Sequence, residues 1–432
     1  MIVLKRNYSV SKGSIIRFLL SVMMLFASFF HMSGIGRFLF ICIFVMNIYC
    51  AIKTRDNNAL LIVYLFLLWS NYSIYLYFWT DKIQKYLMYK YFVTDNQVMS
   101  VAVYSLYIFN AVLFVLCSKI KRKVLEEKYE GESLKSIIVG DHSSKWMACL
   151  VIIVIILISL YSMSIRINRG YMPASPLYEY LYIFFIVSFY LSCGNKKIDA
   201  VISLLIVVNC IYVFFNGARI SAIQFALVFF MRFIMHRIPK RLMFIGIFMA
   251  IIGLNAIGMW RGFTEFDLGY FIKSLKYLFS TGITLDTAYS AEASGMCIIK
   301  LIGDYSVLGR LRLFVIYVIY VFVGSKAFGV ESNLAALAQE SYHYATGGGV
   351  LPCFGLFYLG YFGVVLVAVL VGHYLKMLGE YQSETSGYKR CLAAFIFASC
   401  MRWYLYSPAP LLRGALLFSI VFFLTTKFRI KE

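Results

Sequence analysis

The chain has 432 residues, of which 62% are hydrophobic, 18% aromatic and only 14% charged. Soluble domains carry about 25% charged residues, so this composition excludes an ordinary soluble enzyme. Lysine and arginine outnumber aspartate and glutamate by 41 to 20. The basic residues lie at the ends of apolar segments and form no long basic face. The net charge is therefore interpreted as a topology signal, and nucleic-acid binding is not predicted.

Apolar runs long enough to cross the roughly 30 Å hydrocarbon core as helices recur along the chain. The sequence thus predicts an all-α polytopic membrane protein with about twelve transmembrane helices. The predicted spans lie near residues 15–31, 37–52, 59–79, 98–118, 146–164, 177–193, 198–215, 220–236, 242–260, 351–375, 391–407 and 411–427.

Orientation follows from the short loops, because cytoplasmic loops retain lysine and arginine. With the N-terminus inside, every predicted cytoplasmic segment is basic, as in "KIKRK" at 119–123. Both termini are therefore predicted to be cytoplasmic. Residues 1–260 would hold nine spans and residues 351–432 the last three.

Residues 261–350 break this pattern and carry charges of both signs. Long loops are translocated largely regardless of charge, so we predict one large periplasmic loop with interfacial helices. Its apolar run "LFVIYVIYVFVG" at 313–324 is too short to span a membrane, and is expected at the interface.

Several arginines fall on the outer side of this topology, where short loops are normally poor in arginine. The planar guanidinium can bind phosphate oxygens in two places, which favours an anionic ligand. The alternative for each is snorkelling or pairing with a loop carboxylate. The set comprises Arg166, Arg169, Arg219, Arg261, Arg310, Arg312 and Arg413, with Arg402 in the outer third of its span.

Two short segments carry further candidates. In "NGARIS" at 216–221, a turn opens a span, so Arg219 and the helix dipole would favour the same anion. In "SYHYATGGGVLPCFGLFYLGYFG" at 341–363, three glycines form a flexible lip that lets a ligand approach the main chain. The glycines are Gly347, Gly348 and Gly349.

His343 and Glu340 lie just before that lip, and each could accept a proton from a sugar hydroxyl. The alternative for His343 is an ordinary interfacial position between two tyrosines. The ten cysteines include no CxxC pair and no Cys/His cluster at zinc spacing, and no nucleotide-binding motif occurs. Neither a metal nor a cofactor is predicted.

Together these features resemble the Wzy family of O-antigen polymerases. The topology is similar over most of the chain, and three stretches are similar by motif: 216–221, 346–363 and 402–414, the last containing "RWYLYSPAPLLRG". In many relatives an acidic residue follows the glycine lip. Here Leu356 follows Gly355, so no carboxylate is carried over to that place.

The resemblance implies a GT-C-like, metal-independent glycosyltransferase in the bacterial inner membrane. Its donor and acceptor would both be oligosaccharides linked to undecaprenyl diphosphate, joined at the periplasmic face. Arg219, His343 and Glu340 would be catalytic. The residues that would bind the diphosphate and the sugars are Arg219, Arg261, Arg310, Arg312, Arg402, Arg413, Gly347, Gly348 and Gly349. Membrane lipid and a chain-length-determining co-polymerase are candidate partners.

Two alternatives remain open. An O-antigen ligase, which moves the finished chain onto lipid A–core, would share the fold and the outward arginines. A flippase for the lipid-linked unit should instead have charged residues deep in several spans and two similar halves. Here the charges cluster at one face near the last spans, which favours chemistry at that face.

Overall fold

The structure is a computed structural model of the 432-residue chain. It describes residues 12–53, 58–78, 96–120, 138–140, 144–164, 178–215, 219–235, 286–323, 328–342, 348–379 and 386–427, with isolated positions between 239 and 279. All regular secondary structure within these residues is helical, which confirms the predicted all-α class.

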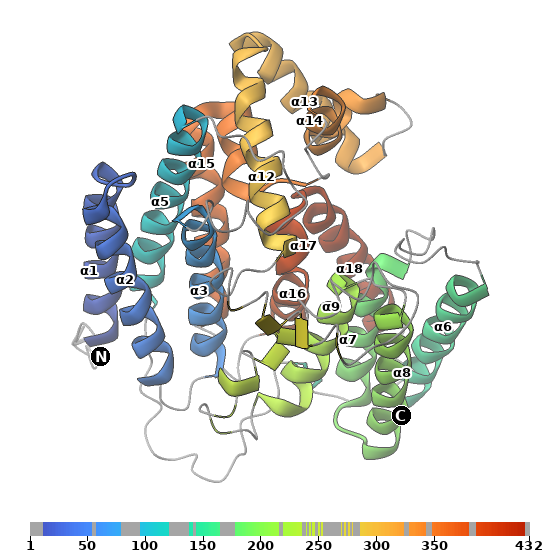
Figure 1. Ribbon diagram of the computed structural model, residues 1–432. Helices are drawn as coiled ribbons and strands as arrows, with labels where there is room; N and C mark the ends of the chain where they lie inside the picture. The colour runs from blue at the N-terminus through green and yellow to red at the C-terminus, as the bar shows by residue number, and fades with distance from the viewer. Residues whose placement is uncertain are drawn as a thin grey trace, which may run out of the picture.

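One group of helices packs together on one side of the molecule (Figure 1). It consists of α1 (Lys12–Phe29), α2 (Gly34–Lys53), α3 (Asn58–Phe78), α5 (Asn96–Ser118) and α15 (Leu351–Gly379). In this group α5 lies at the centre, because it contacts α1, α3 and α15 and buries most of its length.

A second group lies on the opposite side (Figure 1). It consists of α6 (Lys145–Ser164), the 3-10 turn η2 (Tyr178–Tyr180), α7 (Leu181–Ser192), α8 (Lys196–Phe215), α9 (Arg219–Phe229) with the π-helical turn η3 (Phe230–Ile234), α16 (Gly387–Ala398) and α18 (Ala409–Lys427). Here α7 is central, because eleven of its twelve residues are buried, on all sides of an apolar helix.

The short α17 (Cys400–Leu405) joins the two groups, because it contacts α15 in the first and α16 and α18 in the second. The helix α12 (Asp286–Lys300) packs against α3, α5 and α15 of the first group and against α17. Figure 1 shows α12 running from the middle of the bundle to its upper end, beside α15. Above the bundle lie α13 (Val307–Val323) and α14 (Leu334–Ser341), preceded by the 3-10 turns η4 (Leu301–Gly303) and η6 (Gly329–Ser332). The stretch expected to be a loop thus contributes α12 to the bundle itself.

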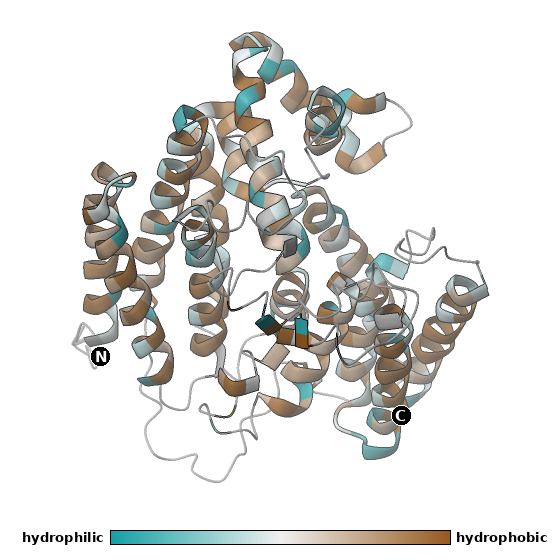
Figure 2. Ribbon diagram, viewed as in Figure 1, coloured by the Kyte–Doolittle hydropathy of each residue, from teal (hydrophilic) through white to brown (hydrophobic). Residues whose placement is uncertain are grey.

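Among the described residues, six helices are long and apolar enough to cross a membrane, as expected for a multi-pass membrane protein. They are α2, α3, α5, α6, α15 and α18, and each coincides with a predicted span. Three shorter apolar helices, at 13–29, 178–192 and 220–234, coincide with three more. Figure 2 shows the hydrophobic colouring of these helices extending to their outer faces, where side chains such as Phe38 and Leu157 are exposed.

Three predicted spans do not coincide with any of these nine helices. The span at 198–215 corresponds to α8, and that at 391–407 is divided into α16 and α17 at Ser399. The span at 242–260 lies mostly outside the described residues.

The apolar segment after the glycine lip folds back on itself. Gly360 has φ 64° and ψ −154° inside α15, a conformation that favours glycine. The arm before Gly360 crosses the arm after it so closely that a Cβ on Gly355 would lie 2.8 Å from the carbonyl oxygen of Gly363. The glycines of "GLFYLGYFG" are therefore required by this turn and this crossing.

We predict that Gly363→Ala destabilises the protein by about 1–3 kcal/mol, because the added methyl group has no room between the two arms. Thermal unfolding of the detergent-solubilised protein, followed by size-exclusion elution, measures the effect. Gly303→Ala is the matched control, since a Cβ at Gly303 meets no atom within 4 Å. Equal melting temperatures for the two variants would contradict the crossing.

Candidate functional site

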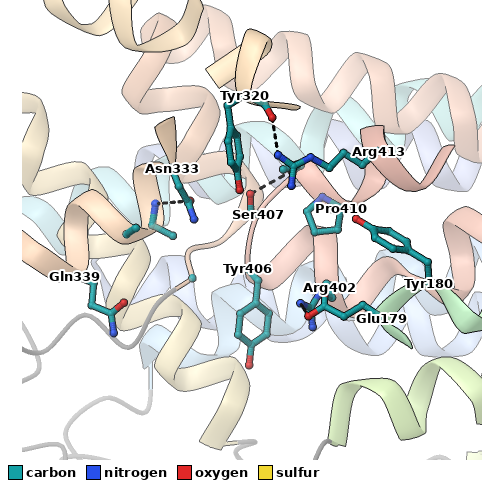
Figure 3. Close-up of a pocket in the computed structure, with 14 residues that line it drawn as sticks. Glu179, Tyr180, Tyr320, Asn333, Gln339, Arg402, Tyr406, Ser407, Pro410 and Arg413 are labelled. Carbon is teal, nitrogen blue, oxygen red and sulfur yellow. Dashed lines mark hydrogen bonds and ion pairs between the residues drawn. The ribbon is translucent and has the colours of Figure 1, made fainter. Parts of the chain in front are cut away.

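A cavity of about 310 Å³ lies between the α13–α14 layer and the bundle (Figure 3). Its walls come from the start of α14, the end of α13, η2, the α17–α18 connection and the glycine lip. The lining residues are Glu179, Tyr180, Tyr320, Asn333, Ala335, Ala336, Gln339, Gly348, Arg402, Tyr406, Ser407, Ala409, Pro410 and Arg413.

Arg402 reaches the cavity from α17 and makes an ion pair with Glu179. Its Nη2 lies 2.6 Å from Oε1 of Glu179, and the two side chains are 21% and 28% exposed. The pair is thus open to the cavity and is not sealed inside the bundle.

The position of Arg402 is fixed by the two residues that follow it. Trp403 stacks on Phe66 at 5.5 Å between ring centroids, and its Nε1 donates to the carbonyl of Ile396 at 3.0 Å. Tyr404 donates its hydroxyl to Oγ of Ser73 at 3.2 Å. Because both aromatic side chains are buried, α17 is held rigidly and presents its arginine at a fixed place.

Arg413, on the first turns of α18, holds the end of α13. Its Nε donates to the carbonyl of Val321 at 2.7 Å, and its Nη2 donates to that of Tyr320 at 2.5 Å. The guanidinium carbon also lies 4.2 Å from the centroid of the Tyr320 ring. These carbonyls belong to the last turn of α13, the negative end of its dipole, where a cation is stabilising.

Two helix N-termini face the same cavity. At α14, the Asn333 side chain accepts a hydrogen bond from the backbone N–H of Ala335 at 3.2 Å. At α18, Oγ of Ser407 accepts one from the N–H of Ala409 at 3.3 Å. Helix N-termini carry partial positive charge, so they add to the two arginines in favouring an anion.

The glycine lip forms part of the cavity wall beside α17. Gly348 and Gly349 have φ values of 153° and 157°, and Gly349 donates its N–H to the carbonyl of Leu405 at 3.0 Å. A Cβ on Gly348 would lie 3.1 Å from that same carbonyl oxygen. The glycines are needed here for close backbone approach.

The other predicted residues lie elsewhere. Nη1 of Arg310 donates to the carbonyl of Phe357 at 3.1 Å. Phe357 lies near the end of the short arm of α15, the part before Gly360. Arg312 pairs with Glu331 at 3.0 Å on the surface, with 70% and 49% of the side chains exposed. Glu340 is exposed and does not line the cavity. Outside the described residues lie Arg166, Arg169, Arg261, His343, Gly347 and the side chain of Arg219.

Of the predicted set, the structure therefore brings together Arg402, Arg413 and Gly348. Sequence reasoning did not single out Glu179 or Tyr320. Glu179 is an acidic residue at the outer end of a predicted apolar span. A carboxylate at such a place is a candidate ion-pair partner for an outward arginine. Among the described residues, no cluster of three or more His, Cys, Asp or Glu side chains could hold a metal ion.

Behind the cavity, Glu292 of α12 is 1% exposed. Ser73 and Tyr77 of α3 lie beside its carboxyl group, with Cys353 and Tyr404 nearby. Burial raises the pKa of Glu292 to about 8, so the group is mainly neutral at pH 7.

Comparisons of the chain with family models, with curated proteins and with solved structures find no match. Any assignment of function therefore depends on the cavity and on the motifs of the sequence.

The buried acid predicts a pH-dependent effect of Glu292→Gln. The pKa of Glu292 in the folded protein lies above its ordinary value. The wild type therefore loses stability as the pH rises from about 4.5 to 8, and this loss is absent below that range. The variant should unfold at a higher temperature than the wild type at pH 7, by the equivalent of at most about 3 kcal/mol.

Melting temperatures between pH 5 and 8 test this, and the difference should shrink toward pH 5. Glu340→Gln, which removes an exposed carboxylate, is the control. A difference for Glu292→Gln that does not change with pH would contradict the neutral, buried acid.

Proposed function

We propose that the protein is a glycosyltransferase that uses oligosaccharides linked to undecaprenyl diphosphate, and specifically an O-antigen polymerase. The observation that carries the proposal is the cavity in which Arg402, Arg413 and two helix N-termini converge at one end of the bundle. The family resemblance of the sequence supplies the substrate class.

The chemistry of the leaving group suits such a cavity. Transfer of a sugar breaks the bond between its anomeric carbon and the diphosphate, and negative charge grows on the departing oxygen. Fixed cationic groups stabilise that charge without rearranging, and each contributes roughly 2–4 kcal/mol in a transition state. Arginine can bind two phosphate oxygens at once, so it also orients the leaving group.

In this proposal the cavity faces the periplasm and both termini lie in the cytoplasm. The outer faces of the apolar helices would contact lipid, and the α13–α14 layer would lie at the membrane surface. Exposed apolar side chains along α13, such as Leu308 and Phe322, support that position, since they suit the boundary between head groups and acyl chains. The polyprenyl chain would remain in the bilayer while its diphosphate enters the cavity.

The lipopolysaccharide pattern of a strain lacking this gene separates the candidate functions. Core carrying a single repeat unit, restored to a ladder by the wild-type gene, supports a polymerase. Bare core with polymer accumulating on undecaprenyl diphosphate would identify a ligase. Bare core without externally accessible units would identify a flippase and overturn the proposed chemistry.

In the same complementation, Arg402→Lys should lower polymer formation about 100-fold at equal expression. Lysine retains the charge but cannot bind two oxygens in the geometry of the planar fork. Arg37→Ala is the control, because Arg37 is an exposed arginine of α2 outside the cavity. A normal ladder from Arg402→Lys would remove Arg402 from the proposed site.

A further inference from the structure

Among the described residues that line the cavity, one carries a carboxylate, Glu179. Glu179 lies in the turn η2, whose position is fixed by its neighbour Tyr178. The Tyr178 hydroxyl donates to Oδ1 of Asn209 at 3.0 Å, and its ring packs edge-on against Phe225 at 6.0 Å. A buried residue thus anchors the turn, while the next side chain projects toward the cavity (Figure 3).

The carboxylate of Glu179 occupies the place where an anionic ligand would bind Arg402. A carboxylate oxygen at 2.6 Å from a guanidinium nitrogen forms the same charge-assisted contact as a phosphate oxygen. The surrounding groups are Arg413 and the positive ends of α14 and α18, which favour negative charge at this position. A bound anion and Glu179 would therefore compete for Arg402.

We propose that Glu179 is the proton acceptor of the transfer reaction, released from Arg402 when the diphosphate of the donor binds. This inference rests on the proposed function and assigns the base within its site. Diphosphate carries more negative charge than one carboxylate and can contact both arginines, so it displaces Glu179 from Arg402. The freed carboxylate remains in the cavity, within the space where the acceptor sugar must enter.

The transfer forms one bond at the anomeric carbon and breaks another. The acceptor hydroxyl oxygen bonds to the anomeric carbon of the donor, and its proton passes to the carboxylate of Glu179. The bond between the anomeric carbon and the diphosphate oxygen breaks, and its electron pair leaves with undecaprenyl diphosphate. When that product departs, Glu179 gives its proton to water and pairs again with Arg402.

The sequence predicted two bases, His343 and Glu340, of which Glu340 lies among the described residues. Its position differs from that of Glu179. Glu340 is exposed on α14 and does not line the cavity. A base must come within about 3 Å of the hydroxyl that it deprotonates, which favours a carboxylate that already faces the anion-binding groups.

The test uses the full chain in proteoliposomes, with lipid-linked repeat units as substrate and undecaprenyl diphosphate as the binding probe. Glu179→Gln should lower the transfer rate at least 100-fold. It should bind undecaprenyl diphosphate as tightly as the wild type or several-fold more tightly, because the competing charge is gone. Glu179→Asp, which keeps the carboxylate, should recover part of the rate.

The pH profile supplies a readout that a structural role would not change. The dependence of the transfer rate on pH should therefore differ between the wild type and Glu179→Gln. Glu331→Gln, which removes the carboxylate of the exposed pair with Arg312, should leave rate and profile unchanged.

Three results would overturn the inference. Transfer by Glu179→Gln within threefold of the wild-type rate would exclude a base at this position. Loss of probe binding together with transfer would show that Glu179 only supports Arg402. A wild-type protein that neither binds the probe nor transfers sugar would overturn the proposed function as well.

Discussion

The contact between Arg413 and the last carbonyls of α13 ties one wall of the cavity to the bundle. It joins α18, at the end of the chain, to a layer formed more than ninety residues earlier. The cavity is the space enclosed between that layer and the bundle. Arg413 thus neutralises the negative end of α13 and places its charge on the wall of the cavity, so one side chain supports both the architecture and the electrostatics.

Close backbone packing provides the rigid base for this arrangement. A Cβ on Gly295 of α12 would lie 3.0 Å from Sγ of Cys353, and the glycine lip passes between α12 and α17. Small residues let these helices approach where lipid provides no hydrophobic driving force between them. The fold-back of α15 at Gly360 completes the arrangement, with Arg310 at the carbonyl end of its short arm. Arg310 is thus placed to stabilise a helix terminus.

The sequence predicted the helical class and the places of the long apolar helices, because their length and composition are local properties. It did not predict that α12 packs inside the bundle. That helix has a low overall hydrophobicity and contains Glu292, but its cluster of Ala, Ser and Gly residues is typical of close helix packing. Within the site, Arg402, Arg413 and Gly348 were predicted from their positions at span ends. Glu179 was not, since its role depends on a contact 223 residues away along the chain.

The pair between Arg402 and Glu179 also bears on selectivity for the ligand. A partly buried guanidinium without a counter-charge is unfavourable, and an internal carboxylate offsets that cost while the cavity is empty. A ligand must then bind Arg402 better than Glu179 does. A monoanion would exchange one charge for another at little gain, whereas the proposed diphosphate would add contacts to Arg413 and to the two helix N-termini. Under the proposed function, the resident carboxylate would favour ligands with several negative charges, and the release of Glu179 would follow from binding of the diphosphate donor.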